Sequence, residues 1–300
     1  MEEGKPSPTA ISGAMMRAAH LLLDDDPKIL QDDLAIQLSG LKDNAALQAV
    51  VDAMISKISH HADTEFAHRF VRYLRAEVSQ RSRYAEDELA KAIQGGVTQY
   101  VILGAGLDSF VYRNRNVGKI LQVFEIDHPA TQRWKQDILN TLEMETPSNL
   151  TFIPLDFERK TLRESLHENG YRFDIPCFFS WLAVTPYLTE DAIFNTLKDI
   201  ESLAAGTEVV FEYMVPDSLL NEEDQRTALV AKAVTSQGGE QALSFFDPVE
   251  LKARVQSMGF TVIEDFGPED ANERYFAGRK DGLRAFPSFH LMKARVSSNA

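Results

Sequence analysis

The stretch from Gln99 to Pro129 limits the possible folds more than any other part of the chain. It begins with Tyr100–Leu103, a short apolar run whose length and β-branched side chains are typical of a buried parallel strand. The run ends at a loop with the sequence GAGLD, Gly104–Asp108, and a second apolar run follows from Ile120 to Phe124. Two such runs joined through a glycine turn predict the first two strands of an α/β sheet.

The loop and the end of the second run predict a site for a nucleoside. Gly104 and Gly106, on either side of Ala105, permit a tight turn and let the backbone approach a ligand closely. The second run ends in two acids, Glu125 and Asp127, about twenty residues after the glycines. At that distance a carboxylate at the tip of the second strand meets a ribose in nucleotide-binding sheets. We therefore predict that the loop and Asp127 bind a cofactor.

The loop departs from the fingerprint of nicotinamide-binding proteins. Ser109 stands where that fingerprint has a third glycine, which allows close packing beside a pyrophosphate, and Asp108 places an acid in the loop. A carboxylate would repel a pyrophosphate but suits a ligand with a positive centre. S-adenosylmethionine, with its sulfonium and ammonium groups, is such a ligand. A nicotinamide-dependent dehydrogenase stays an alternative, although no catalytic acid for it is evident.

Two segments carry a resemblance to a known family. They are G-A-G-L-D-S at 104–109, followed by Tyr112-Arg113, and F-E-I-D-H-P at 124–129. In this order and spacing they resemble the leucine carboxyl methyltransferase family and its bacterial and fungal natural-product O-methyltransferase relatives. The resemblance implies a class I S-adenosylmethionine-dependent methyltransferase with a Rossmann-like α/β sheet and helices on both of its faces. A similar sheet whose glycines serve only packing is the structural alternative.

Composition excludes several kinds of partner. The 300-residue chain has a formal charge of −14, whereas nucleic acids and anionic membranes need a basic face, so we expect neither as a partner. We find no signal peptide and no run of about eighteen apolar residues, and we expect a soluble, cytoplasmic protein. The single cysteine, Cys177, excludes a disulfide framework and a cysteine-based zinc site. The adjacent His60 and His61 would need further ligands to bind a metal, and we predict no metal site.

The order of the predicted elements divides the chain near residue 95. Residues 1–95 are predicted to be helical, whereas strands and helices alternate over 96–300. In the resembling family the N-terminal helices form a cap over the cofactor, and the segment 14–27, with Arg17 and His20, matches the part that closes. A solvated helix face is the alternative for these two side chains. The helices expected here are Thr9–Leu23, Ala45–Ile58, Glu65–Val78 and a further one that opens at Arg81.

The predicted sheet continues beyond Pro129. A polar helical insertion over 217–245, which carries Gly238-Gly239, interrupts its alternation of strands and helices and is a candidate lid or substrate-facing element. Residues from Asp281 onward carry no prediction. The expected elements are a helix at Ala130–Leu142, a third strand at Thr151–Leu155, a fourth strand and its tip within Asp174–Leu188, a helix after Thr189, a fifth strand at Glu208–Met214, a helix at Pro248–Met258, and a closing antiparallel hairpin of Phe260–Phe266 with Arg274–Gly278.

The resemblance also implies a catalytic arginine. In the family an arginine before the first strand holds a carboxylate at the active site, and Arg81 is the better match to it, with Arg83 second. A guanidinium suits that role because two N–H groups can meet both carboxylate oxygens. The carboxylate would be that of the substrate or that of the donor. A surface ion-pair patch with Glu86 and Asp87 is the alternative.

The ends of the third and fourth predicted strands add further matches. The family places an acid and an apolar residue against the adenine, and Asp156 and Phe157 match that pair, with a turn cap as the alternative for Asp156. Tyr187 matches a tyrosine that faces the substrate. The chain departs from the family just before it, because the run from Ser180 to Leu182 lacks the acid that relatives often place near the methionine part of the donor.

The choice of methyl acceptor follows from ionisation. A carboxylate, with a pKa near 4, is already charged at pH 7 and needs no general base, whereas a phenol, with a pKa of about 10, does. Of the seven histidines only His20 and His128 lie near the predicted site, and neither is at a strand tip. We therefore predict O-methylation of a carboxylate of a small metabolite or natural-product acid. The alternatives are a phenol or hydroxyl acceptor, a protein C-terminal carboxylate, and a non-catalytic binding protein with this fold.

Overall fold

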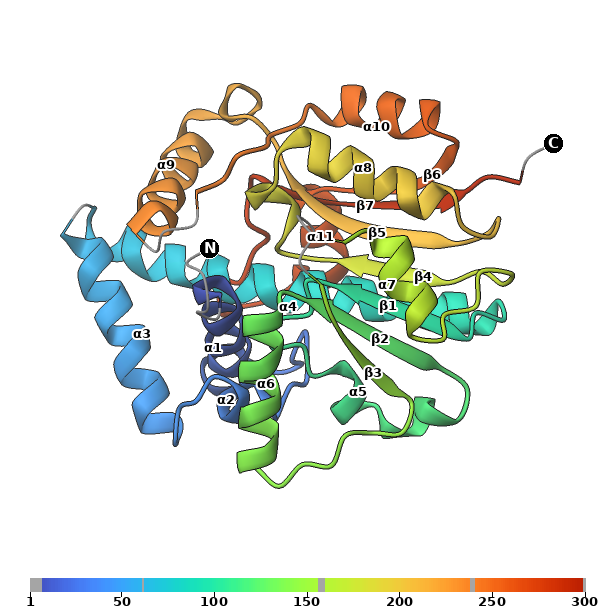
Figure 1. The fold of residues 1–300 in the computed structure, drawn as a ribbon. Coiled ribbons are helices and arrows are strands. Elements are labelled where there is room, and N and C mark those ends of the chain that lie inside the picture. Colours follow the sequence, from blue (N-terminus) through green and yellow to red (C-terminus); the bar gives the residue numbers. More distant parts are fainter. Residues whose placement is uncertain (1–6, 61, 156–159, 238–240, 299–300) are drawn as a thin grey trace.

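A computed structural model describes residues 7–60, 62–155, 160–237 and 241–298. Its centre is a seven-stranded sheet in the order β3-β2-β1-β4-β5-β7-β6 (Figure 1). The strands β1 to β5 run parallel, and β7 pairs antiparallel with β5 on one side and β6 on the other. The strands are β1 (Gln99–Leu103), β2 (Gln122–Asp127), β3 (Leu150–Pro154), β4 (Phe178–Trp181), β5 (Glu208–Met214), β6 (Phe260–Phe266) and β7 (Phe289–Val296).

Helices cover both faces of the sheet, which confirms the predicted Rossmann-like α/β fold. The helices are α1 (Pro8–Leu23), α2 (Ala35–Leu38), α3 (Asn44–Ser59), α4 (Thr64–Gln94), α5 (Phe110–Arg113), α6 (Pro129–Thr141), α7 (Leu162–Glu168), α8 (Glu190–Glu201), α9 (Glu222–Gln237), α10 (Pro248–Ser257) and α11 (Pro268–Ala271). Shorter helical turns are η1 (Arg115–Lys119), η2 (Thr185–Tyr187), η3 (Asp217–Leu219) and η4 (Asn272–Phe276). Within the described ranges no helix is both long and apolar enough to cross a membrane.

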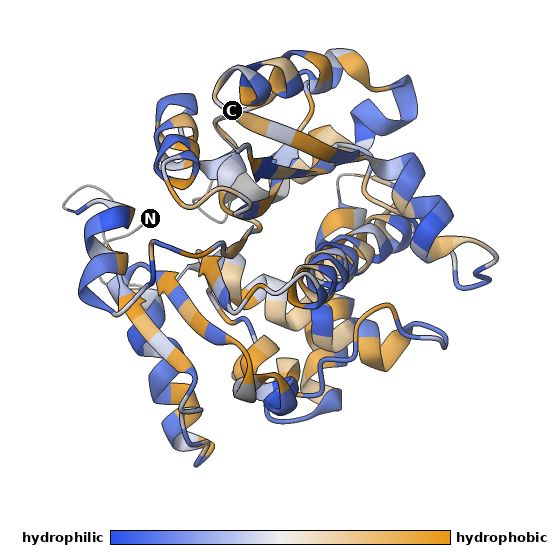
Figure 2. Cartoon of the chain, turned by 90° about the vertical axis from the view of Figure 1, so that its right-hand side faces the viewer, coloured by the Kyte–Doolittle hydropathy of each residue, from blue (hydrophilic) through white to orange (hydrophobic). Residues whose placement is uncertain are grey.

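The side chains of β1 show why the sheet is buried on both faces. Tyr100 and Ile102 pack with residues of α4 and α5, whereas Val101 and Leu103 pack with residues of α7, α8 and α10. Successive side chains of a strand point to opposite faces, so an uninterrupted apolar run supplies two cores at once. Figure 2 shows that hydrophobic residues are frequent on the strands, while the outer helices carry many hydrophilic ones.

One long helix replaces two predicted ones. The prediction of separate helices, one at Glu65–Val78 and one opening at Arg81, is wrong, because α4 runs unbroken over 31 residues. Asp63 caps its start, where the carboxylate accepts a hydrogen bond from the N–H of Phe66 at 2.7 Å. The polar stretch Ser79–Ser82 contains no glycine or proline that would end a helix, and Ser79 is fully buried.

The predicted strand Arg274–Gly278 is also wrong. Residues 272–276 form the π-helical turn η4, and the closing strand is β7, which lies in the part without a prediction. The apolar alternation of β7 is interrupted by Lys293, which is buried in the sheet. Its ammonium contacts the carboxylate of Glu88 at 2.7 Å and that of Glu208 at 3.0 Å. A buried lysine needs such partners, and these come from distant parts of the chain.

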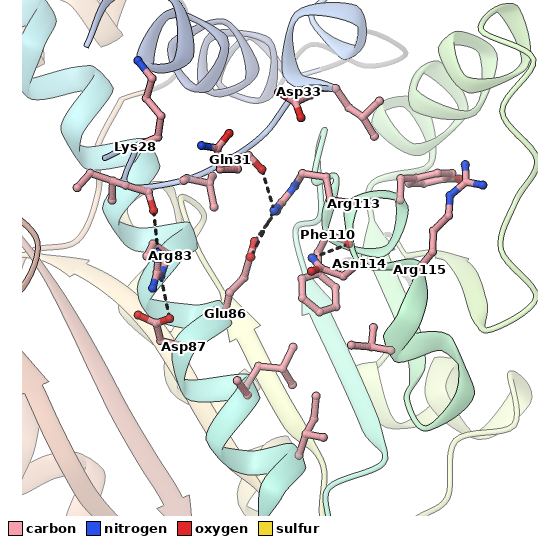
Figure 3. Close-up of a pocket in the computed structure, with 18 of the residues that line it drawn as sticks. Lys28, Gln31, Asp33, Arg83, Glu86, Asp87, Phe110, Arg113, Asn114 and Arg115 are labelled. Carbon is pink, nitrogen blue, oxygen red and sulfur yellow. Dashed lines mark hydrogen bonds and ion pairs between the residues drawn. The ribbon is translucent and has the colours of Figure 1, made fainter. Parts of the chain in front are cut away.

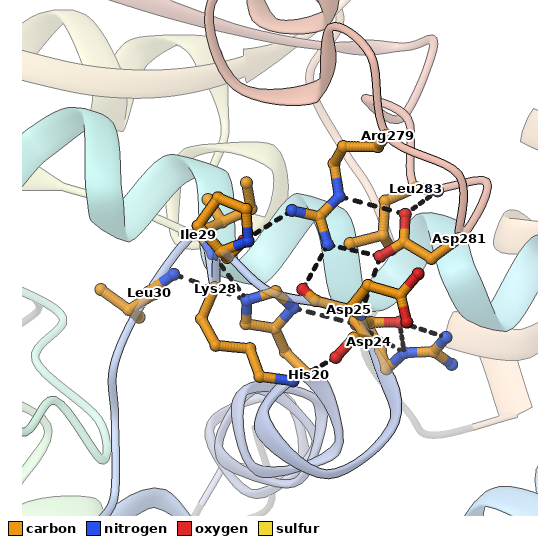
Figure 4. Close-up of polar contacts among 11 residues, drawn as sticks. His20, Asp24, Asp25, Lys28, Ile29, Leu30, Arg279, Asp281 and Leu283 are labelled. Atoms are coloured by element: carbon orange, nitrogen blue, oxygen red, sulfur yellow. Dashed lines mark hydrogen bonds and ion pairs between the residues drawn. The ribbon is translucent and has the colours of Figure 1, made fainter.

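A buried polar network holds the loop that follows α1 (Figure 4). His20 is 0% exposed, and its Nε2 accepts a hydrogen bond from the N–H of Ile29 at 2.9 Å. The proton therefore lies on Nδ1, which donates to the Asp24 carboxylate at 2.9 Å. The same carboxylate accepts hydrogen bonds from Arg75, the shortest at 2.7 Å.

Arg279 extends this network from the far end of the chain (Figure 4). Its guanidinium donates to the carbonyl oxygens of Pro27 at 2.6 Å and Asp25 at 2.7 Å, and it pairs with Asp281. The loop after α1 is thus closed by residues about 250 positions later.

We expect Asp24→Asn to lower the free energy of unfolding by about 3 kcal/mol, because it leaves the Arg75 guanidinium buried without a countercharge. Urea denaturation at pH 7 measures the change. The matched control is Asp33→Asn, which removes an exposed carboxylate and should change stability by no more than about 0.5 kcal/mol.

The pH dependence of this effect has a defined sign. Burial alone would raise the pKa of Asp24, but the hydrogen bonds from His20 and Arg75 outweigh it and the pKa is lowered. The stabilisation by the carboxylate is therefore present above its unfolded-state pKa of about 4 and is lost as the pH falls through the lowered folded-state pKa. A cost of Asp24→Asn that did not shrink between pH 4 and pH 2 would contradict this account.

Candidate functional site

A cavity of about 500 Å³ lies at the carboxyl ends of β1, β2 and β4. Open α/β sheets bind their ligands at this edge. The predicted site residues that line the cavity are Arg81, Gly104, Ala105, Gly106, Asp127 and Tyr187. Asp156 and Phe157 lie outside the described residues, and their contact with an adenine stays a prediction.

A second cavity, of about 710 Å³, lies between residues 28–34, α4 and α5 (Figure 3). Four of its charged side chains form two ion pairs, Arg83 with Asp87 at 2.8 Å and Arg113 with Glu86. Arg83, the second match for the active-site arginine, lines this cavity, and the alternative of an ion-pair patch describes it correctly. The candidate active site is therefore the cavity at the strand ends, where the other predicted residues meet.

Two neighbouring residues, Val184 and Ala10, lie close to the backbone of the glycine loop. Gly104 and Gly106 have φ angles of +66° and +51°, in the left-handed region that favours glycine. A Cβ atom at Gly104 would lie 2.2 Å from a methyl group of Val184, and one at Gly106 would lie 3.1 Å from Cβ of Ala10. The loop thus has the tip of β4 on one side and helix α1 on the other.

Of the two acids on β2, Asp127 belongs to the site. Its carboxylate accepts hydrogen bonds from the N–H groups of Gly106 and His128, the latter at 2.6 Å. Burial raises the pKa of Asp127 above its usual range, although these two bonds oppose the shift. Glu125 does not line the cavity and pairs with the buried Lys135; burial raises the pKa of Glu125 to about 7.

Two guanidinium groups meet beside helix α1. Nη1 of Arg81 lies 3.2 Å and 3.3 Å from the two carboxylate oxygens of Glu212. Arg17 donates to Asp32 at 2.8 Å and to the carbonyl oxygen of Leu107 at 2.6 Å. Both guanidinium groups lie near Gly13, because a Cβ there would lie 3.9 Å from Nη2 of Arg81 and 3.8 Å from Nη1 of Arg17.

The neighbouring carboxylates keep the guanidinium of Arg81 protonated. Burial alone would lower the pKa of the Arg81 guanidinium, but Glu212 and Glu77 outweigh it and the pKa is raised. Arg81 is thus a permanent cation at the wall of the cavity, and 12% of its side chain is exposed.

Glu212 on β5 supports the site from behind the cavity lining, and the sequence reasoning missed it. Its carboxylate is 0% exposed and accepts a hydrogen bond from the N–H of Ala183 at 2.8 Å, while its carbonyl oxygen accepts one from the hydroxyl of Thr185. Ala183 has a φ angle of +58°, which is uncommon for a residue with a Cβ. Glu212 therefore holds both Arg81 and the turn after β4. The visible signal was a glutamate in the middle of a strand whose neighbouring residues, Phe211 and Tyr213, are apolar or aromatic.

The two histidines predicted near the site differ in position. His128 lines the cavity, and its Nδ1 accepts a hydrogen bond from the N–H of Ala130 at 3.3 Å, which caps helix α6. The prediction that His20 lies near the site is wrong. Its side chain does not line the cavity, because it turns into the buried network around Asp24. The alternative of a solvated face is wrong for His20 as well.

The predicted insertion reaches the cavity with one short segment. Its helix is α9, and Gly238 and Gly239 lie outside the described residues. Gln241 and Leu243 line the cavity, and the N–H of Leu243 donates to the carbonyl oxygen of Pro186 at 2.7 Å. Trp181 is 1% exposed and belongs to the apolar core rather than to the cavity.

Comparisons with known proteins identify the family of the chain. Residues 10–201 match the model of the leucine carboxyl methyltransferase family. YktD of Bacillus subtilis strain 168, named as an S-adenosyl-L-methionine-dependent methyltransferase, is 30% identical over 305 residues, which cover 98% of this chain and 99% of the relative. A protein of Mycobacteroides abscessus named for the same activity is 30% identical over 295 residues, which cover 94% and 89%.

Solved structures share the fold. A DUF574 family protein from Streptomyces avermitilis has a TM-score of 0.56 at 15% identity, with 87% of this chain and 94% of that chain covered. A protein from Thermobifida fusca named as a methyltransferase has a TM-score of 0.51 at 16% identity, with 99% and 97% covered. The strand order, the cavity at the strand ends and these matches lead to one conclusion: the chain belongs to the leucine carboxyl methyltransferase family and is an S-adenosylmethionine-dependent methyltransferase.

Proposed function

We propose that this enzyme methylates a carboxylate of a small metabolite or natural-product acid. The donor, when bound, supplies a methyl group that bonds to a carboxylate oxygen while the C–S bond breaks and its electron pair stays on sulfur. The protein receives and gives no proton in this step. Its task is to position the two reactants and to exclude water.

The observation that carries this proposal is that the predicted bases have no free lone pair. Because Nδ1 of His128 accepts the N–H of Ala130, the neutral ring presents an N–H group rather than a lone pair at Nε2. Both ring nitrogens of His20 are bonded inside the protein. The described residues that line the cavity include no lysine and no cysteine. A carboxylate needs no base and fits this cavity better than a phenol does.

The glycine loop and Asp127 suit the nucleoside of the donor. A carboxylate at the tip of the second strand, beside a loop whose backbone is open to a ligand, is the arrangement that holds a ribose. We assign the ribose hydroxyls to Asp127, and the adenine to Asp156 and Phe157.

The two guanidinium groups match the two carboxylates that the reaction brings together. Arg17 is bonded to Leu107 of the glycine loop, so we assign it to the carboxylate of the donor. Arg81 is held by Glu212 beside the turn after β4, so we assign it to the acceptor carboxylate. Tyr187, in the same turn, would form the wall that faces the acceptor.

In this proposal residues 1–95 act as a cap on the methyltransferase domain of residues 96–300. The contact between Ala10 and Gly106 and the bond from Arg17 to Leu107 support this role. Met16, Leu47 and Phe70 of the cap pack in an apolar cluster that also contains Phe286, so this cluster joins the cap to the methyltransferase domain.

Asp127→Ala should weaken S-adenosylmethionine binding by about 1.5–3 kcal/mol, the range for hydrogen bonds to a charged group. Isothermal titration calorimetry measures the affinity, and Asp137→Ala, which removes an exposed carboxylate of α6, is the matched control. An unchanged affinity in a folded Asp127→Ala protein would refute the placement of the donor.

Arg81→Lys should lower kcat/KM about 10- to 150-fold, because an ammonium cannot reproduce the paired contacts that align the attacking oxygen. The loss should appear in kcat as well as in KM, while donor affinity stays within about twofold. A selective loss of donor affinity would assign Arg81 to the donor carboxylate instead.

The pH profile separates the two kinds of acceptor. With a carboxylate acceptor, kcat should be level from about pH 6 to 8, because the reaction needs no general base and Glu125, whose pKa is about 7, does not line the cavity. Steady-state rates in matched buffers of constant ionic strength test this. A steep rise across this range would favour a hydroxyl acceptor, with His128 losing its cap contact to act as the base.

A further inference from the structure

We infer that the acceptor is an acid with an apolar body, and that Leu243 sets the preference for that body. The inference rests on the proposed function, because it concerns the part of the same cavity that lies beyond the reacting carboxylate. Three observations support it: the distribution of charge in the cavity, the side chains after β4, and the way in which Leu243 is held.

The charged side chains of the cavity gather at the parts assigned to the donor and to the reacting carboxylate of the acceptor. Among the described lining residues they are Arg17, Arg81, Asp108 and Asp127. Asp108 and Asp127 belong to the glycine loop and the tip of β2, and the two arginines meet at Gly13. A charged group on the distal part of a substrate would find no partner elsewhere in this lining.

The wall after β4 is apolar. Leu182, Val184 and Leu188 line the cavity there, on either side of the turn that carries Tyr187. Small-molecule sites combine such apolar walls with a few polar groups that fix orientation. An alkyl or aromatic body would lose its contact with water against these side chains, while Arg81 would orient the carboxylate.

Leu243 closes this wall at the mouth of the cavity. Its side chain lines the cavity and is 56% exposed. Its N–H donates to Pro186 at 2.7 Å, the hydroxyl of Ser244 donates to the carbonyl oxygen of Thr185 at 3.0 Å, and the N–H of Phe246 donates to Met214 at 2.9 Å. These bonds hold an apolar side chain partly in water, next to the turn with Tyr187. A substrate body seated there would cover it.

The test uses straight-chain carboxylic acids from butanoate to decanoate. For each acid, kcat/KM is measured by mass spectrometry of the methyl ester, with the full-length protein and S-adenosylmethionine. We expect kcat/KM to rise about fourfold for each added methylene, the value that corresponds to about 0.8 kcal/mol per buried CH₂. Leu243→Ser should reduce this increment for the longer acids to less than twofold. Leu229→Ser, at a leucine of α9 that is 67% exposed and does not line the cavity, should leave it unchanged.

The inference would be overturned if kcat/KM of the wild-type enzyme did not rise with the chain length of the acid. It would also be overturned if kcat/KM rose by the same factor per methylene in wild type and in Leu243→Ser. If no methyl ester forms with any acid, the same series is titrated by calorimetry in the presence of S-adenosylhomocysteine. Affinity that rises with chain length and falls in Leu243→Ser would then support the apolar subsite while the proposed carboxylate chemistry fails. Absence of binding by every acid would overturn the subsite itself.

Discussion

The arrangement of the site depends on the buried ion pair between Arg81 and Glu212. Taking both charges out of water costs free energy that their attraction offsets only when the geometry is good and further hydrogen bonds are made. Glu212 has such bonds, because its carboxylate meets the guanidinium and also accepts the N–H of Ala183. Arg81 belongs to α4 and Glu212 to β5, so the pair sets the N-terminal helices and the sheet in one relative position. Its contribution is therefore to geometry more than to stability.

The inner face of α4 is unusual because it carries charges into the interior. Glu77, one turn before Arg81, is also buried, and burial together with the neighbouring Glu212 raises its pKa well above the usual range. Glu88, further along the same helix, pairs with Lys293 of β7. A face of this kind does not show the simple apolar stripe of a helix that packs on a sheet. Its register is fixed by the ion pairs of Arg81 with Glu212 and of Glu88 with Lys293.

These charges also explain which parts of the fold the sequence alone could predict. The strand β1, the glycine loop and Asp127 have local signals, since they lie within about thirty residues and combine apolar runs with glycine at positive φ. The presence of an acid at Glu212 is visible in the strand sequence, but its role is not, because its partner Arg81 lies 131 residues away. The same holds for Lys293, because its charge interrupts the apolar pattern by which the strand β7 would be predicted. It also holds for Arg17, whose contact with Leu107 forms only when α1 packs on the glycine loop. The periodicity of apolar residues therefore predicts the strands and helices, but it does not predict which charged residues pair across long distances in the sequence.

The position of β7 has a consequence for how the protein forms during translation. β7 lies between β5 and β6, although both precede it in the chain. Until residues 289–296 have left the ribosome, β5 has β4 on one side and an open edge on the other. Such an edge is a template for pairing with other chains. The nascent protein thus carries the strand with Glu212 paired on one edge alone from the synthesis of Met214 until that of Val296.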